Sequence, residues 1–286
     1  MHADNIRFIW DFPTDKASLT FTSENANMPG KYVQNQQVSK LWRSISYPVG
    51  QVADQEFVFS LEKYTPFSAI VLWNINLSIT SQVRLILALN EEFTEITFDQ
   101  TWAGVRALYG YGEGPYGAIP YGGYSLEGLV NYPFFVKFFD AVPGTFVKVL
   151  IIDPQNPSGY IQAGKIALGY YFSPEFNLNY GYTPKYQFQS KQSLSRSGAI
   201  RTNRRVKNKE IPISLNYLSM QETQKIDDAI RDRDMNKNIL VSVYPNEGTT
   251  RERKHIVLGF LKEGTFSGIT REKSTYKCSF TIIEGK

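Results

Sequence analysis

The chain has 286 residues, of which 42% are hydrophobic and 14% aromatic, enough for two ordinary domains with filled cores. Its single cysteine, Cys278, excludes an internal disulfide framework, and its two histidines, His2 and His255, lack the spacing of a zinc motif. No secretory signal opens the sequence, and no apolar run approaches the roughly 20 residues that span a bilayer. We therefore expect a soluble protein with no metal or other cofactor and no membrane partner, made in a reducing cytoplasm.

The formal charge of +4 is distributed unevenly along the chain. Eight basic residues and one acid lie between Lys185 and Glu210, a local charge of +7 that leaves −3 for the rest. Because the basic character belongs to one segment, the composition argues against a protein that coats nucleic acid.

Residues 1–175 are predicted to form one β domain. Short segments rich in Val, Ile, Phe and Tyr alternate with clusters of Pro, Gly, Asn and Asp, and no helical pattern separates them. About eight such strands are typical of a β-sandwich or jelly roll. The predicted strands are 7–10, 18–22, 56–61, 69–73, 81–89, 134–139, 145–151 and 165–170.

A Gly/Tyr-rich insertion, residues 103–125, interrupts this domain. Its stretch 108–124 reads LYGYGEGPYGAIPYGGY, with six glycines and five tyrosines. Glycine allows close backbone approach and tyrosine offers a wide contact area at low entropy cost, a combination typical of contact loops. The loop either contacts another chain or a glycan, or covers the edge of its own sandwich. The candidate contact residues are Trp102, Tyr109, Tyr111, Tyr116, Tyr121 and Tyr124.

Residues 176–209 are predicted to form an extended basic arm or linker, because aliphatic residues are almost absent from them. Clustered cations can neutralise phosphates, but the tyrosines of the first domain are not interleaved with them as a single-strand binding platform would prefer. We therefore expect a solvated loop, or an arm that meets an acidic surface on a neighbouring subunit, and no direct nucleic-acid partner. The candidate interface residues are Lys191, Arg196, Arg201, Arg204, Arg205 and Lys207.

Residues 210–286 are predicted to form a second domain with one short helix. In 210–217, Ile211, Ile213, Leu215 and Tyr217 alternate with polar residues, as in a half-buried strand. Ser219 and Glu222 form a capping box that predicts a helix over 220–233. Its apolar stripe and the three strands that follow complete the domain. The stripe is Met220, Thr223, Ile226, Ala229 and Ile230, and the strands are 239–244, 255–262 and 276–283.

No sequence motif of a known catalytic site is present. The chain lacks a GxSxG elbow, an HExxH helix and a phosphate loop ending in GK[ST]. A polysaccharide depolymerase would need a pair of carboxylates, and such pairs leave no local signature. We therefore predict a protein that is not an enzyme.

Three segments of the first domain resemble the galactose-binding-like jelly roll of discoidin and coagulation-factor C-type domains. They are LWRS at 41–44, FSAIVLWNINLSITSQVRLILA at 67–88 and FVKVLIIDPQNPSGYIQAGKIALG at 146–169. Their order and spacing, over about 170 residues, carry the resemblance. It implies a jelly-roll β-sandwich that could recognise a host surface glycan through loop aromatics, although the place of Trp73 in AIVLWN favours a buried position.

The whole chain is similar to structural proteins of tailed bacteriophages. It shares a segment like W-x-x-N-x-N-L-S at 73–78, repeated Pro-aromatic-Gly units, NP-x-GYI-x-x-G-x-I-x-LG at 156–169 and S-P-x-x-N-x-x-Y-G at 173–181. The family often has tryptophan in the aromatic units, where this chain has Tyr116 and Tyr121. The second domain resembles the tail-tube and distal-tail fold, a β-sandwich or barrel with one short helix.

The phage resemblance implies a minor tail or distal-tail (baseplate) component at the tip of the virion tail. Such a protein would assemble in the host cytoplasm as a homo-oligomeric ring, with sixfold symmetry, and join the tail tube to hub or tip proteins. The second domain would build the ring and the jelly roll would face outward. The alternative function is a carbohydrate-binding module that recognises a host surface glycan.

Overall fold

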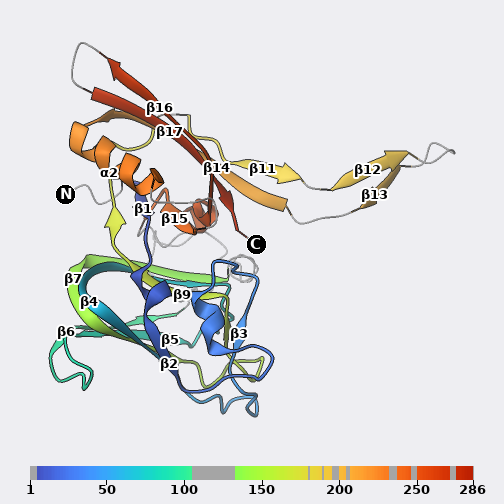
Figure 1. The fold of residues 1–286 in the computed structure, drawn as a ribbon. Helices are drawn as coiled ribbons and strands as arrows, with labels where there is room; N and C mark the ends of the chain where they lie inside the picture. Colours follow the sequence, from blue (N-terminus) through green and yellow to red (C-terminus); the bar gives the residue numbers. More distant parts are fainter. Residues whose placement is uncertain are drawn as a thin grey trace, which may run out of the picture. The chain divides into compact units, whose positions relative to one another are not determined.

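A computed structural model of the chain describes residues 5–104, 133–179, 181–188, 190–194, 200–203, 207–231, 237–245, 250–270 and 275–285 (Figure 1). The chain divides into two compact units. Asp11–Tyr171 forms one, which we call the jelly-roll unit, and Met1–Trp10 with Phe172–Lys286 forms the other, which we call the split unit. Both are built mainly from antiparallel strands, so the predicted mainly β fold class is confirmed. Among the described residues, no helix is long and apolar enough to cross a membrane.

The jelly-roll unit is a β-sandwich in which two long strands contribute to both layers. Its strand order is β2-β4-β7-β5-β6, and β9 also pairs with β4. Figure 1 shows β4 and β7 curving through the unit. The bounds are β2 Ser18–Phe21, β4 Gln55–Trp73, β5 Gln82–Ala88, β6 Ile96–Ala103, β7 Phe134–Ile152 and β9 Lys165–Gly169.

The sequence predicted two strands where β4 runs continuously, and two where β7 does. The start of β4 pairs with β2 and its end pairs with β9, while β7 follows it on the other side. The apparent breaks at Pro66 and Pro143 are cross-strand partners of each other, so the two prolines sit together where both strands change register. The ladder continues on both sides of this proline pair, which neither segment reveals when it is considered alone.

The core of the jelly-roll unit follows the period-two pattern of its strands. Alternate side chains of β4, β5 and β7 are fully or almost fully buried, and they pack together. Trp73 is buried and stacks on Phe134, with ring centroids 4.6 Å apart, so it belongs to the interior. The buried residues of these strands include Phe57, Phe59, Leu61, Val83, Leu85, Leu87, Val147, Val149 and Ile151.

The split unit contains a seven-stranded sheet with the order β10-β1-β15-β16-β17-β14-β11. The segment 7–10 was predicted to belong to the jelly roll, but β1 pairs with β15. Phe8 is fully buried there against Trp10 and Phe280, so these apolar contacts bring β1 into the second core. The bounds are β1 Arg7–Ile9, β10 Tyr171–Phe172, β11 Lys185–Phe188, β14 Lys207–Leu218, β15 Ile239–Ser242, β16 Ile256–Thr270 and β17 Thr275–Glu284.

The predicted helix is confirmed as α2, Met220–Arg231, and its capping box is present. The amide of Ser219 donates to Glu222 Oε2 at 2.8 Å, and the amide of Glu222 donates to Ser219 Oγ at 3.3 Å. Ile226 is buried in the core, whereas Met220 is 59% exposed and does not extend the apolar stripe. A second short helix, α3 Thr250–Lys254, was not predicted.

Strand β14 confirms the predicted alternation only up to Leu215. Ile211, Ile213 and Leu215 are buried, but Tyr217 is 62% exposed. A β-bulge between Leu215 and Leu218 changes the register, and Tyr217 takes a φ of +61°. Leu218 therefore enters the core in place of Tyr217.

The predicted extended arm, 176–209, contains paired strands. β11 pairs with the start of β14, and β12 (Lys191–Leu194) pairs with β13 (Ile200–Asn203) as a separate two-stranded ribbon. Strand pairing satisfies backbone N–H and C=O groups whatever the side chains are. A segment with few aliphatic residues can therefore form strands, although its composition predicted a linker.

Candidate functional site

A short antiparallel ribbon in the jelly-roll unit presents a cluster of polar and aromatic side chains. It pairs β3 (Trp42–Arg43) with β8 (Gln162–Ala163). Backbone bonds continue the pairing as far as Tyr47, whose amide donates to the carbonyl of Gly159 at 2.8 Å. Gly159 has a φ of +70°, and a Cβ there would lie 2.8 Å from the carbonyl oxygen of Tyr47. Glycine therefore allows this close approach of the two backbones.

The two sides of this ribbon differ sharply in burial. One side is fully buried and faces the core, and the other is partly or largely exposed, as the period of a strand requires. The buried residues are Trp42, Ser44, Ile161 and Ala163. The outward residues, which we call the ribbon face, are Arg43, Ile45, Tyr160 and Gln162.

Arg43 is the centre of the ribbon face. Its guanidinium carbon lies 4.0 Å from the centroid of the Tyr160 ring, a cation–π contact. Its Nη2 donates to Gln162 Oε1 at 3.2 Å. Its Nε is shielded from water and has no hydrogen-bond partner among the described residues. One guanidinium thus links an aromatic ring and an amide that lie on the opposite strand.

Asn76 fixes the backbone of the ribbon from the side. Its Nδ2 donates to the carbonyl of Tyr160 at 2.9 Å, and its Oδ1 accepts from the amide of Gln162 at 2.8 Å. Ser44 Oγ accepts from the amide of Ile161 at 3.1 Å. The Asn76 carboxamide and the Ser44 hydroxyl thus satisfy backbone groups of this ribbon that no neighbouring strand pairs with. These bonds fix the backbone beneath the ribbon face.

A buried network supports Asn76 in turn. Asn156 Nδ2 donates to the carbonyl of Asn76 at 2.7 Å and to Asp153 Oδ2 at 2.9 Å. Asp153 is fully buried and also accepts from the amide and hydroxyl of Ser78, at 2.8 and 2.5 Å. Neutral donors therefore reach both oxygens of Asp153. In the part of the chain that the structure describes, no group of three or more His, Cys, Asp or Glu side chains could hold a metal ion.

The ribbon face combines the groups that a polyhydroxylated ligand can use. The Tyr160 ring and Ile45, which is 46% exposed, offer apolar surface, while the guanidinium and the amide of Gln162 offer donors and an acceptor. None of these groups forms the nucleophile–base pair of a hydrolytic enzyme.

The predicted contact residues of the Gly/Tyr insertion lie elsewhere. Trp102, on β6, is partly buried, and its ring packs against those of Phe98, Phe135 and Phe139 at centroid distances of 6.1 to 6.3 Å. It belongs to an aromatic cluster on the core. The other five predicted contact residues lie outside the described residues, so their role stays a prediction: Tyr109, Tyr111, Tyr116, Tyr121 and Tyr124.

The predicted interface cations are only partly described. The backbone positions of Lys191 and Arg201 lie on β12 and β13, and Lys207 begins β14, where its amine lies 5.1 Å from the Phe188 ring centroid. The structure therefore places the backbone of Lys191 and Arg201 on the β12–β13 pair and Lys207 on β14, beside the terminal strand β11. Their contact with a neighbouring subunit stays a prediction. Arg196, Arg204 and Arg205 lie outside the described residues.

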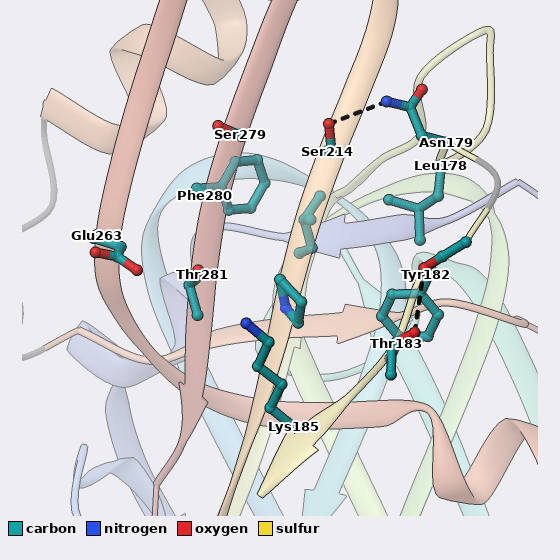
Figure 2. Close-up of a pocket in the computed structure, with 13 residues that line it drawn as sticks. Leu178, Asn179, Tyr182, Thr183, Lys185, Ser214, Glu263, Ser279, Phe280 and Thr281 are labelled. Atoms are coloured by element: carbon teal, nitrogen blue, oxygen red, sulfur yellow. Dashed lines mark hydrogen bonds between the residues drawn. The ribbon is translucent and has the colours of Figure 1, made fainter. Parts of the chain in front are cut away.

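The split unit contains a pocket of about 510 Å³ beside β14 (Figure 2). Asn179 donates through its amide to the carbonyl of Ser214 at 3.2 Å and through Nδ2 to Ser214 Oγ at 3.1 Å. The β11–β14 ladder ends where Lys185 pairs with Glu210. Pro212, two residues further along β14, has no N–H group with which to continue it. The pocket thus lies where the ladder is interrupted.

The pocket carries charge on opposite sides and hydroxyl groups between them. Figure 2 shows Lys185 and Glu263 on separate elements, with Ser279 and Thr281 on the strand between. Burial raises the pKa of Tyr182 above its ordinary value, so this lining residue stays a neutral phenol at physiological pH. The pocket offers hydrogen-bonding groups from several elements of the split unit.

The sequence analysis did not single out Arg43, Tyr160 or Gln162 as contact residues. All three lie in segments that carried the jelly-roll resemblance, LWRS and GYIQAG. In GYIQAG, Tyr160 and Gln162 are two residues apart, the spacing that places side chains on one face of a strand, whereas LWRS has two apolar residues followed by two polar ones. The missing information was the pairing itself, because Arg43 and Gln162 are 119 positions apart.

No protein-family model matches the sequence, and no curated protein matches it. Solved carbohydrate-binding modules are similar to part of this chain at low identity. CpGH89CBM32-5 from Clostridium perfringens, in complex with GalNAc-β-1,3-galactose, is 11% identical, with a TM-score of 0.38, covering 56% of this chain and 99% of its own.

Two further modules are similar to the same degree. The family 32 module of Clostridium perfringens NanJ, in complex with galactose, is 15% identical, with a TM-score of 0.36, and the match covers 59% of this chain and 99% of that module. Chitosan-binding module 1 from a Paenibacillus chitosanase/glucanase is 13% identical, with a TM-score of 0.36, and the match covers 55% of this chain and 98% of that module. At such values the likeness carries no argument about what this chain binds, which has to come from its own geometry.

Proposed function

We propose that the jelly-roll unit binds a carbohydrate through the ribbon face. The observation that carries the proposal is the contact of Arg43 with both Tyr160 and Gln162 on an outward face. This function was the alternative in the sequence analysis, but it is placed here on different residues.

The physical match is with a sugar ring, which has apolar C–H surfaces and hydroxyl groups around its edge. Tyr160 and Ile45 would contact the apolar surface, and the Arg43 Nη groups and the Gln162 amide would bond the hydroxyls. Because Asn76 already fixes the backbone beneath them, little ordering cost accompanies binding.

A glycan array probed with the full-length protein tests this proposal. We expect Tyr160→Ala and Gln162→Ala to weaken binding roughly tenfold each, the effect of losing one well-placed hydrogen bond or ring contact. Tyr64→Ala is the matched control, because Tyr64 is 64% exposed elsewhere in the same unit. If no surface polysaccharide is retained, or if all three variants bind as the wild type does, the ribbon face is not a carbohydrate site.

The Gly/Tyr insertion offers a second location for the same function. Tyr116→Ala and Tyr121→Ala belong in the same array, since their loss of binding would assign the contact to the insertion. Turnover of a bound polysaccharide by the isolated protein would contradict the further proposal that the protein is not an enzyme.

A second candidate function is assembly into a homo-oligomeric ring. β11 ends the strand order of the seven-stranded sheet, and all four of its residues are exposed. Tyr186 is 57% exposed and Phe188 is 64% exposed. Large exposed aromatic residues on a terminal strand favour a partner, because sheet edges are usually protected by charge or cover.

The ring would fit the phage resemblance, in which a distal-tail protein of the virion joins the tail tube to hub or tip proteins. The comparisons with known proteins lend that identity no support. Sedimentation of the wild type and of Phe188→Glu tests the assembly. An oligomer in the wild type and a monomer in the variant are expected, and a wild type that stays monomeric at high concentration contradicts the ring.

A further inference from the structure

We infer that the ribbon face selects a glycan that carries a carboxylate, such as a uronic or sialic acid unit. The inference rests on the proposed carbohydrate-binding function and specifies the class of sugar. It follows from the electrostatic state of Arg43.

Arg43 has no counter-charge among the described residues. The groups that contact its guanidinium, the Tyr160 ring and the Gln162 amide, are neutral, and each ion pair of the described residues involves other side chains. The acids on neighbouring loops are engaged elsewhere. Glu24 accepts from the amide of Gly30 at 2.7 Å, and Asp153 is fully buried in its own network.

A partly buried cation that has no counter-charge favours an anionic ligand. Removing charge from water is unfavourable unless a partner of opposite charge replaces the lost hydration. The shielded Nε of Arg43 lacks even a neutral hydrogen-bond partner in the described residues. A ligand anion at the terminal Nη groups would therefore relieve a cost that the free protein carries.

The shape of the guanidinium favours a carboxylate over other anions. Its planar fork donates two parallel hydrogen bonds to the two oxygens of a carboxylate, which adds directional specificity to charge attraction. The Tyr160 ring covers one face of the guanidinium and Gln162 Oε1 accepts from Nη2, so both groups fix the plane of the fork. A carboxylate that meets the fork in this plane leaves its sugar ring beside Tyr160 and Ile45.

The experiment uses matched pairs of glycans and the full-length protein. Glycans that contain galacturonate, glucuronate or sialic acid are compared with the same glycans after reduction of the carboxyl group to an alcohol, and with sulfated and phosphorylated glycans. Affinities are measured by calorimetry at low and high salt. We expect reduction to weaken binding at least tenfold, and salt to weaken binding of the acidic form only.

Variants of Arg43 assign the effect to one side chain. Arg43→Gln is expected to abolish the preference for the acidic form, and Arg43→Lys to keep the salt dependence with a weaker preference, because lysine retains charge without the fork. Lys63→Gln is the charge-matched control, since Lys63 is exposed elsewhere in the unit. Unchanged circular dichroism and melting temperature verify folding, and Tyr160→Phe provides a second variant that keeps the ring.

The outcomes separate this inference from the proposal beneath it. Equal affinity for acidic and reduced glycans, or a preference for sulfate or phosphate, would overturn the carboxylate inference and leave carbohydrate binding standing. Retention of no glycan in any form would overturn the carbohydrate function itself. An acidic preference that survives in Arg43→Gln would also overturn the assignment to Arg43.

Discussion

Lys165 and Asp15 form an ion pair that the jelly-roll unit removes almost completely from water. Lys165 Nζ lies 2.9 and 2.7 Å from the two carboxylate oxygens, and the two side chains are 0% and 13% exposed. Burial raises the pKa of Asp15 and lowers the pKa of Lys165, and their mutual attraction opposes both shifts. In such a pair the loss of one partner costs far more than the loss of both.

Removal of the amine alone therefore leaves an unpaired carboxylate in the interior. We expect Lys165→Met to lower the free energy of unfolding by about 3–5 kcal/mol and the double variant Lys165→Met with Asp15→Leu to recover most of that loss. Urea denaturation followed by tryptophan fluorescence measures both, because Trp42 and Trp73 lie in this unit. A double variant no more stable than Lys165→Met would contradict the account.

Lys209 is a second buried cation, in the split unit, and it gives that unit a pH dependence. Lys209 is 7% exposed, and burial lowers its pKa to about 8 although Glu284 opposes the shift. The folded state thus holds this proton less tightly than the unfolded state does. The resulting stabilisation is complete above the unfolded pKa of about 10.4 and is lost as the pH falls through about 8.

The difference in unfolding free energy between wild type and Lys209→Met should follow this window. We expect the wild type to gain up to about 3 kcal/mol relative to the variant between pH 7 and pH 10.5. Lys207→Met, an exposed position on the same strand, should follow the wild-type slope. Urea titrations at stepped pH values provide the measurement, and parallel slopes for wild type and Lys209→Met would refute the assignment.

At the scale of elements, the bulge of β14 holds Tyr217 in a backbone conformation that bulky residues avoid. Its φ of +61° is left-handed, its side chain is 62% exposed, and its ring lies 6.1 Å from that of Phe176. The bulge allows Leu218 to enter the core, which offsets the local strain.

An asparagine at this position should relieve the strain, because asparagine tolerates the left-handed region. We expect Tyr217→Asn to raise the free energy of unfolding by about 0.5–1 kcal/mol and Tyr217→Val to lower it. Thermal melts of the two variants decide the matter. If Tyr217→Asn destabilises the protein as much as Tyr217→Val does, the lost contact with Phe176 outweighs the relief of backbone strain.

The elements also show which features the sequence could predict. Helix α2 was predictable because its capping box and apolar positions lie within a few residues of each other. The continuity of β4 was not, because Pro66 lies opposite Pro143 of β7, a partner far away in the sequence. The ribbon face could not be predicted from the sequence for the same reason. The spacing of Tyr160 and Gln162 was visible in the sequence, but their place beside Arg43 depended on the pairing of β3 with β8.

At the scale of the whole chain, the jelly-roll unit is inserted between two neighbouring strands of another sheet. The chain leaves the split unit after β1 and returns at β10, which lies beside β1 in the strand order. The first strand is essential to that sheet, since Ile6 and Phe8 are fully buried in its core. The predicted domain boundary at residue 1 missed this, because the apolar pattern of a strand does not specify its partner.

Truncation of Phe8 should therefore act on the distant half of the sequence. We expect Phe8→Ala to lower the free energy of unfolding of the split unit by about 3–5 kcal/mol, the cost of a large core cavity. Hydrogen-exchange mass spectrometry should show lost protection in β15 and β16 and unchanged protection in β4 and β5. Phe176→Ala, 52% exposed in the same unit, is the control, and lost protection in β4 would contradict the division into units.

The ion pair of Lys165 and Asp15 has a consequence for the order in which the chain folds. Together with the bond from the Leu168 amide to Thr14 Oγ1, it joins the two ends of the jelly-roll unit. Once that unit has folded, β1 and β10 are already close, and the entropy cost of closing a long loop between them is reduced. During synthesis β1 emerges first, its neighbour β10 follows as soon as the jelly-roll unit is complete, and its other neighbour β15 is made later.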